Sequence, residues 1–255
     1  MARNCITLFT LFCLVSLFQI MPLQAQDEKN IQIPPELTEV WEPEARMVTP
    51  GTAAAPPSDA IVLFDGNNLE EWLSAQDDSP ARWTINADGS MTVAPGAGDI
   101  KTRRLFGDVQ LHLEFRTPTV ITGDGQGRGN SGVFFQERYE VQVLDNYNNR
   151  TYSNGQAGSI YKQYIPLVNV CRPPGEWQTY DIIYTAPRFN KDGIRIQAGT
   201  LTVIQNGVLV QNHSEIKGTT EYIGWPQNLA HGPAALKLQD HGNLVSYRNI
   251  WIREL

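Results

Sequence analysis

Val109-Gln110-Leu111-His112-Leu113-Glu114-Phe115-Arg116 decides the fold of this 255-residue chain. Apolar and polar side chains alternate along the stretch with a period of two. That period is typical of a β-strand with one face in a core and the other facing water. The stretch therefore predicts a sheet whose inner face is apolar.

Other short runs rich in β-branched and aromatic residues lie on both sides of this stretch. We expect strands at residues 61–64, 131–136, 139–144, 179–184, 201–205, 208–212, 235–239 and 246–253. One hairpin is predicted around residues 86–89, and another at Asn206-Gly207. No segment has the pattern of a long amphipathic helix. The chain is predicted to be all-β, a two-sheet antiparallel sandwich of the jelly-roll type.

Composition narrows the classes of function. The chain has 20 Lys and Arg against 27 Asp and Glu, a formal net charge of −7. Binding to nucleic acid needs a basic face that neutralises phosphates, so a general nucleic-acid binder is excluded. Hydrophobic residues make up 41% of the chain, which predicts a globular protein with a substantial core.

The N-terminus has the pattern of a targeting segment. Arg3 precedes an apolar run at residues 6–20, and a more polar stretch follows up to Ala25. We interpret residues 1–25 as a signal peptide cleaved near Ala25, which predicts export to the periplasm or the extracellular space. No membrane span is expected after its removal. Residues 26–58 form a Pro-rich N-terminal extension, and residues 59–255 form the β-sandwich domain.

The positions of the cysteines fit this division into signal peptide, extension and domain. Cys5 and Cys13 would leave with the signal peptide, so Cys171 is the single cysteine expected in the mature protein. An intramolecular disulfide is then impossible, and the core must stabilise the fold.

Two predicted strands place polar groups on one face. Glu140 and Gln142 share a face of the strand at 139–144. Lys237, Gln239 and His241 share a face of the strand at 235–239 and the residues after it. Such groups either lie in water or line a cleft; Lys, Gln and His side chains can bind sugar hydroxyls or a carbonyl oxygen, and a histidine can give or take a proton. The alternative for the second strand is that Asp240 and His241 cap a turn.

A rigid turn and two long loops add further candidates. In Arg172-Pro173-Pro174-Gly175-Glu176-Trp177, the cation could position an oxyanion and the indole could stack on a sugar ring. The alternatives are a solvated Arg172 and a core Trp177. The loops at 117–129 and 146–157 are rich in Gly and Asn, and loops of this kind often flank a ligand site.

The ordered set of motifs resembles the 3-keto-disaccharide hydrolase family. The matching stretches run from the N-terminal to the C-terminal end of the predicted domain: Leu63-Phe64-Asp65-Gly66 with Trp72, residues 129–135, residues 139–145, residues 157–161, residues 172–177, residues 180–182, His231-Gly232-Pro233, Leu238-Gln239-Asp240-His241-Gly242 and residues 248–253. The resemblance implies a concanavalin A-like jelly roll, of the lectin and glucanase type, exported from a bacterial cell and acting on 3-keto-glycosides.

The same sandwich is similar to glucanases that have a Glu-x-Asp-x-x-Glu strand. Here the corresponding residues are Glu140, Gln142 and Asp145. Gln142 cannot ionise, and Asp145 needs a bulge to reach the face of Glu140. Hydrolysis by two flanking carboxylates is therefore disfavoured.

A 3-keto sugar permits a different route, in which the ketone acidifies the C2 hydrogen and the C1 substituent leaves. Water then adds to give the 3-keto hexose. This needs a base, an oxyanion stabiliser and an acid. We expect Glu140 or His241 as the base, the other of the two as the group that assists departure, and Lys237 or Arg172 at the enolate.

The remaining family positions would hold the substrate or a metal. The residues expected to bind the sugar are Gln142, Gln239, Trp177, Asn130 and Tyr161. A divalent cation is a further option, because it could polarise the ketone; its ligands would be Glu140, His231 and His241.

Two other classes of function are compatible with the same sandwich. A non-catalytic carbohydrate-binding module would need aromatic residues on the polar face and no role for His241. A structural domain that docks to a partner, with residues 27–58 as a tether, would show an exposed apolar patch and no cleft. Polar enrichment beside Glu140 and His241 favours an enzyme acting on a small saccharide; the aglycone and the oligomeric state stay open.

Overall fold

The computed structural model describes residues 33–52 and 55–255. The predicted signal peptide lies outside the described residues. The chain divides into two units, with the boundary in the sequence between Arg46 and Met47. The described part of the first unit contains one short 3-10 turn, η1 (Pro35–Leu37). Across the described residues, none of the helices is long and apolar enough to span a membrane.

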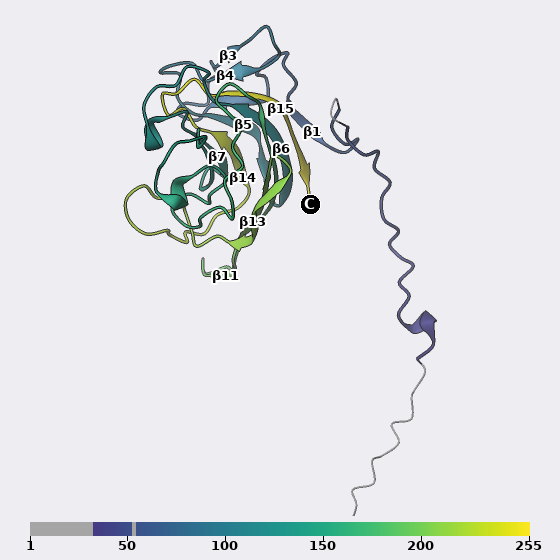
Figure 1. Cartoon of the computed structure of the whole chain (residues 1–255). Helices are drawn as coiled ribbons and strands as arrows, with labels where there is room; N and C mark the ends of the chain where they lie inside the picture. Colours follow the sequence, from purple (N-terminus) through teal and green to yellow (C-terminus); the bar gives the residue numbers. More distant parts are fainter. Residues whose placement is uncertain (1–32, 53–54) are drawn as a thin grey trace, which may run out of the picture. The chain divides into compact units, whose positions relative to one another are not determined.

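The second unit is built from two antiparallel sheets (Figure 1). The eight-stranded sheet runs β13 (Val208–Glu215), β12 (Thr200–Gln205), β9 (Gln178–Thr185), β6 (Val109–Arg116), β15 (Ser246–Glu254), β4 (Met91–Thr92) and β3 (Thr84–Ile85), and β1 (Ile61–Phe64) pairs with β15. The five-stranded sheet runs β2 (Trp72–Ser74), β5 (Ile100–Phe106), β14 (Ala234–Leu238), β7 (Ser131–Phe135) and β8 (Tyr139–Val143). A small hairpin pairs β10 (Arg188–Phe189) with β11 (Arg195–Gln197), and the loops contain the 3-10 turns η2 (Gly125–Gly127) and η3 (Ser153–Gly155). The predicted all-β jelly-roll sandwich is confirmed.

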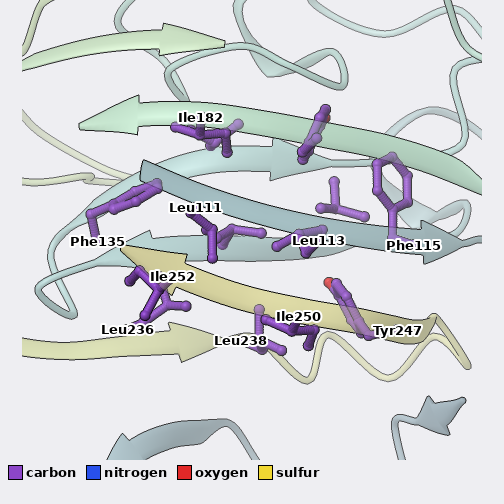
Figure 2. Packing of buried hydrophobic residues seen from close by; sticks show 14 of the residues in the cluster. Leu111, Leu113, Phe115, Phe135, Ile182, Leu236, Leu238, Tyr247, Ile250 and Ile252 are labelled. Atoms are coloured by element: carbon purple, nitrogen blue, oxygen red, sulfur yellow. The ribbon is translucent and has the colours of Figure 1, made fainter. Parts of the chain in front are cut away.

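The core lies between the inner faces of the two sheets. On β6 the residues at odd positions are buried, and the residues at even positions are partly exposed, as the alternation predicts. Figure 2 shows the inner side chains of β6 packed among residues of both sheets, including Ile182, Ile250, Leu236 and Phe135. A fully buried side chain of this kind contributes about 1.5–3 kcal/mol, so the two inner faces hold the sandwich without a disulfide.

The hairpin at Asn206-Gly207 is confirmed between β12 and β13. Both turn residues have positive φ, +51° and +79°, as a two-residue hairpin turn requires. The hairpin of β3 and β4 is also present.

Strand β5 was not predicted. It lies inside the five-stranded sheet, yet Arg103, Arg104 and Leu105 are exposed in its second half. These exposed residues interrupt the alternation by which a strand is normally predicted from sequence.

Strands β7 and β8 are buried on both faces. Their inner faces meet the core, and loops cover their outer faces. Residues 158–161 run along the free edge of β8, where Gln142 N donates to Ser159 O at 3.0 Å and Tyr161 N donates to Glu140 O at 3.1 Å. A solvated outer face for Glu140 and Gln142 is therefore wrong: both side chains lie in a covered site.

Candidate active site

A pocket opens on the outer face of the five-stranded sheet. Its volume is about 230 Å³, and its lining consists of Asn130, Phe134, Glu140, Gln142, Tyr161, Thr220, Tyr222, Gln239 and His241. Drug-sized ligands occupy pockets of about 300–1,000 Å³, so this pocket suits a ligand of a single ring. Six of the predicted site residues meet here, although they come from β8, from the loop after it, and from the residues that flank β7 and β14.

Glu140 is the carboxyl group of this pocket. The residue is 3% exposed. Within the described part of the chain, no group donates a hydrogen bond to its carboxyl oxygens. Burial raises the pKa of Glu140 to about 8, Lys237 opposes that rise and Asp99 adds to it. A carboxyl group of this kind is neutral at pH 7 and becomes a comparatively strong base when it ionises.

Gly132 makes room for that carboxyl group. Gly132 pairs with Gln142 across β7 and β8, two residues along the register from the pair Phe134 and Glu140. A Cβ at Gly132 would lie 2.5 Å from Oε1 of Glu140 and 2.7 Å from a ring carbon of Phe134. The side chain of Glu140 therefore occupies space that any other residue at this position would fill.

Gln142 offers an unused acceptor. Its Nε2 donates to Oδ1 of Asn130 at 3.0 Å. Its Oε1 is buried and has no hydrogen-bond partner among the described residues. A buried carbonyl oxygen without a partner is costly, which points to a ligand hydroxyl as the missing donor.

Two tyrosines stand beside Glu140. Tyr161 is 9% exposed and lines the pocket, and its hydroxyl is hydrogen-bonded to the hydroxyl of Tyr152, which is 38% exposed. Burial, and then the bond to Tyr152, raise the pKa of Tyr161 far above its usual range. Lys162 lies near the rim, with Nζ 4.5 Å from the centre of the Tyr222 ring.

His241 and Asp240 have different roles in the turn after β14. Asp240 caps the turn, because its carboxylate accepts from the backbone N–H groups of Gly98 and Gly242. His241 is exposed and lines the mouth of the pocket. The predicted turn cap is thus correct for Asp240, and His241 belongs to the pocket.

Lys237 lies on the same face of the sheet without lining the pocket. Its Nζ forms an ion pair with Asp99 at 2.7 Å and sits 4.1 Å from the centre of the Phe134 ring. Its positive charge is close enough to lower the pKa of Glu140.

The structure does not bring Arg172 and Trp177 to the pocket. Trp177 is held between Arg116 and Arg248 on the outer face of the other sheet, with guanidinium carbons 4.4 and 4.1 Å from its ring centre. Arg172 donates from Nη1 to the carbonyl oxygen of Trp177 at 2.8 Å. The prediction failed because the turn carries both residues to the opposite sheet.

The predicted metal ligands do not form a set either. His231 bonds through Nε2 to the hydroxyl of Tyr139 at 2.6 Å, and Tyr139 points to the inner side of β8 while Glu140 points outward. In the part of the chain that the structure describes, no three His, Cys, Asp or Glu side chains gather as metal ligands. Glu140, His231 and His241 therefore do not fit a shared cation.

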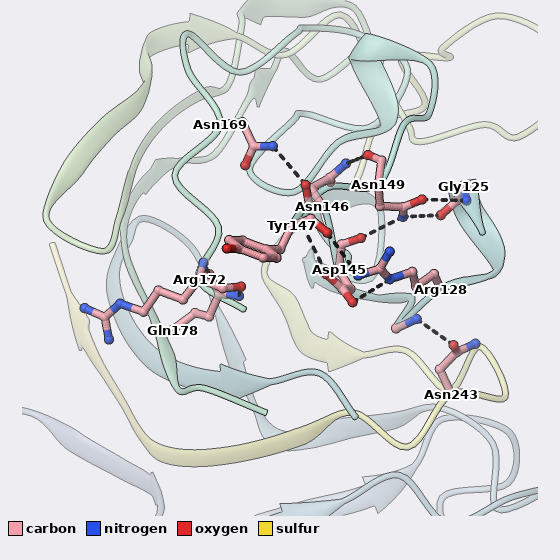
Figure 3. A network of polar contacts seen from close by, with 11 residues as sticks. Gly125, Arg128, Asp145, Asn146, Tyr147, Asn149, Asn169, Arg172, Gln178 and Asn243 are labelled. Carbon is pink, nitrogen blue, oxygen red and sulfur yellow. Dashed lines mark hydrogen bonds and ion pairs between the residues drawn. The ribbon is translucent and has the colours of Figure 1, made fainter. Parts of the chain in front are cut away.

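Asp145 belongs to a loop network outside the pocket. Figure 3 shows its carboxylate facing Arg128, with Oδ2 accepting from Nε at 2.7 Å and Oδ1 accepting from the N–H of Tyr147 at 3.1 Å. Asn149 donates to the Asp145 carbonyl oxygen at 2.7 Å. The second carboxylate that a glucanase-type mechanism needs is thus committed to holding two loops together.

Phe134, Thr220, Tyr222 and Tyr152 are site residues that sequence reasoning missed. Phe134 could have been predicted from the alternation along its strand, because it lies on the same face of β7 as Gly132 and pairs with Glu140 of β8. Thr220 and Tyr222 lie in a loop without a periodic signal, and Thr220 reaches β8 through its Oγ1, which accepts from Glu140 N at 3.0 Å.

Comparison with known proteins identifies the family of the chain. The sequence profile of the 3-keto-alpha-glucoside-1,2-lyase-like domain matches residues 59–253. The chain belongs to this family. A crystal structure from Parabacteroides distasonis, provisionally described as a glycosyl hydrolase, is 55% identical with a TM-score of 0.83, over 88% of this chain and 97% of that one.

More distant members of the fold come from the same organism. Two further crystal structures from Parabacteroides distasonis with the same provisional description have TM-scores of 0.56 and 0.52 at 20% and 24% identity. Each covers 77% of this chain, with 94% and 99% of the other chain covered, and they show the shared fold. No curated protein matches the chain significantly. Membership of the 3-keto-alpha-glucoside-1,2-lyase-like family supports a carbohydrate-active enzyme.

Proposed function

We propose that this protein cleaves 3-keto-glycosides by β-elimination followed by hydration. The observation that supports this most is a single buried carboxyl group in the pocket, Glu140, whose pKa is raised to about 8. Elimination next to a ketone needs one strong base, whereas hydrolysis of an unoxidised glycoside needs two carboxyl groups across the bond. Asp145, the nearest analogue of the second carboxyl group, is paired with Arg128.

The reaction starts at C2 of the sugar. The ionised carboxylate of Glu140 takes the C2 proton, which the C3 ketone has made acidic, and the electron pair delocalises onto the ketone oxygen as an enolate. The pair then returns to form a C1–C2 double bond while the bond from C1 to the leaving oxygen breaks. Water adds across this double bond and gives the 3-keto hexose.

Other groups hold the sugar and balance its charge. Oε1 of Gln142 accepts from a sugar hydroxyl, and Asn130, Gln239 and His241 supply further polar contacts around the ring. Lys237 rather than Arg172 lowers the energy of negative charge on this face, because Lys237 is near Glu140 and Arg172 lies beside the other sheet. Glu140 rather than His241 acts as the base, because Glu140 is buried and His241 is exposed.

The decisive experiment compares 4-nitrophenyl 3-keto-glucoside with 4-nitrophenyl glucoside. We expect release of nitrophenol from the keto substrate alone, and loss of that release in Glu140→Gln. Release from both substrates would instead favour ordinary glycoside hydrolysis. Release from neither by a folded protein would favour a carbohydrate-binding module, which glycan binding by calorimetry would then test.

We also propose that the protein is exported, on the basis of the pattern in residues 1–25. The test is fractionation of cells that express the full chain. Recovery in the periplasm or the medium, with a mature N-terminus near residue 26, supports export; recovery of the intact chain in the cytoplasm contradicts it.

A further inference from the structure

The pocket contains a second proton-carrying group that the reaction above leaves unused. Elimination places negative charge on the leaving oxygen as the bond to C1 breaks. An alkoxide is a poor leaving group, so an acid beside the pocket is needed for alkyl and sugar leaving groups. His241, the sequence-based candidate, is exposed, and no described residue makes a hydrogen bond that would orient its imidazole.

Tyr161 is better placed. It follows Ile160, which bridges to Val141 of β8, and its backbone N–H donates to the carbonyl oxygen of Glu140 at 3.1 Å. Its side chain lines the same pocket as that of Glu140 and is 9% exposed. The base and the phenol thus come from paired backbone segments that hold their spacing fixed.

Tyr152 connects this phenol to solvent. The two hydroxyl groups are hydrogen-bonded, and Tyr152 is 38% exposed, whereas Tyr161 is almost covered. The side of Tyr152 also packs against Gly155, where a Cβ would lie 2.1 Å from a ring carbon, so the ring is held in place. The pair forms a two-step path from the pocket to water.

We propose that Tyr161 is the catalytic acid that protonates the leaving oxygen and that Tyr152 reprotonates it. This assignment rests on the proposed elimination. As the C1–O bond breaks, the O–H proton of Tyr161 passes to the leaving oxygen, which departs as an alcohol. The Tyr152 hydroxyl gives its proton to Tyr161 and takes one from water, and the hydroxide so formed is neutralised by the proton that Glu140 later releases.

Burial supports the assignment of Glu140 as the base and Tyr161 as the acid. It raises the pKa of Tyr161 and of Tyr152, so both phenols keep their protons in the alkaline range where Glu140 is ionised. A base and an acid in the required states therefore coexist above pH 8.

The test uses Tyr161→Phe with two leaving groups. Nitrophenolate is stable enough to leave without a proton, whereas methoxide must be protonated and leaves as methanol. We expect the kcat on methyl 3-keto-glucoside to fall about 100-fold or more, within the range for general acids, and the kcat on 4-nitrophenyl 3-keto-glucoside to fall less than about 10-fold. Tyr152→Phe should show the same selectivity with a smaller loss.

A second reaction isolates the step at C2. 3-Keto-1,5-anhydroglucitol has no exocyclic leaving group at C1, so exchange of its C2 hydrogen in D2O reports proton removal by Glu140 without cleavage. Exchange should persist in Tyr161→Phe and vanish in Glu140→Gln. The matched control is Tyr139→Phe, which removes a hydroxyl from the neighbour of Glu140 on the opposite face of β8. This variant should leave the kcat on both substrates and the rate of C2 exchange unchanged.

The outcomes separate the two proposals. An equal loss on both leaving groups, or a parallel loss of exchange, in Tyr161→Phe would overturn the assignment of the acid while the elimination stands. Absence of both exchange and release in the wild-type protein would overturn the proposed function and this assignment with it.

Discussion

The carboxyl group of Glu140 lies over Gly132 on the neighbouring strand. The space is so tight that a Cβ at Gly132 would lie 2.5 Å from Oε1. The position of the proposed base thus depends on the absence of a side chain one strand away, and this relationship can be tested directly.

Gly132→Ala is expected to lower the kcat for elimination about 100-fold, because the added methyl group displaces the carboxyl group and a misplacement of about 1 Å costs that much. The free energy of unfolding should fall by about 1–3 kcal/mol through overpacking against Phe134. Steady-state kinetics and urea denaturation measure the two effects. Gly107→Ala, where a Cβ meets open space, is the control; equal kinetics in both variants would contradict the expected displacement.

The pH dependence of kcat/KM should follow the ionisation of Glu140. A base must be deprotonated, and the pKa of this one is raised to about 8. We expect kcat/KM for 4-nitrophenyl 3-keto-glucoside to rise about tenfold per pH unit up to about pH 8 and then level off. A kcat/KM that is constant below pH 8 and declines above it would mean that the protonated form of Glu140 is the active one.

Stability should depend on pH through the same group. The pKa of Glu140 rises from 4.5 to about 8 on folding, so the folded state holds the proton more tightly. Between these two values the folded state binds more protons than the unfolded state, and stability therefore falls as pH rises. The full shift corresponds to a loss of about 5 kcal/mol above pH 8.

Glu140→Gln provides the comparison, because glutamine does not titrate. Urea denaturation at pH 5 and pH 9 should give similar free energies of unfolding for the two proteins at pH 5 and a more stable variant at pH 9. A constant difference between them across this range would show that the carboxyl group is not buried as described.

Asp145→Asn should affect stability more than chemistry. Arg128 and Asp145 are 11% and 3% exposed at their side chains, and removal of one partner leaves a buried charge unpaired. We expect a loss of about 3–5 kcal/mol by denaturation and a change in kcat below about 10-fold. A loss of activity as large as that of Glu140→Gln would place Asp145 in the chemistry after all.

Trp177→Ala should leave KM for the keto substrate unchanged, because its ring lies between Arg116 and Arg248 beside the other sheet. The free energy of unfolding should fall by about 1–3 kcal/mol as two cation–π contacts and their packing are lost. A several-fold rise in KM without loss of stability would argue for a sugar-binding role.

Alternation along β6, together with the other short β-branched and aromatic runs and the lack of a helical pattern, predicted the sandwich, because a period of two is typical of a strand with one buried face. The same reasoning placed Glu140 and Gln142 together, and Lys237 with Gln239. It failed for β5, whose exposed Arg103 and Arg104 interrupt the period.

The rest of the site depends on contacts between distant segments. Whether Glu140 lies in water or in a pocket is decided by residues 158–161, which bond to the backbone of β8, and by Thr220, whose hydroxyl accepts from Glu140 N. No local sequence pattern encodes these contacts. Trp177 and Arg172 are residue types that often bind sugars, but the chain topology places the turn that contains them beside the opposite sheet.

The neutral state of Glu140 bears on inhibition. Amine-based sugar mimics bind many glycosidases because a protonated nitrogen meets an ionised carboxylate. Here the carboxyl group keeps its proton at pH 7, and the other acid, Asp145, is already neutralised by Arg128. An uncharged planar ring that imitates the enol, with a hydroxyl for the free oxygen of Gln142, is the shape and charge that this pocket would select.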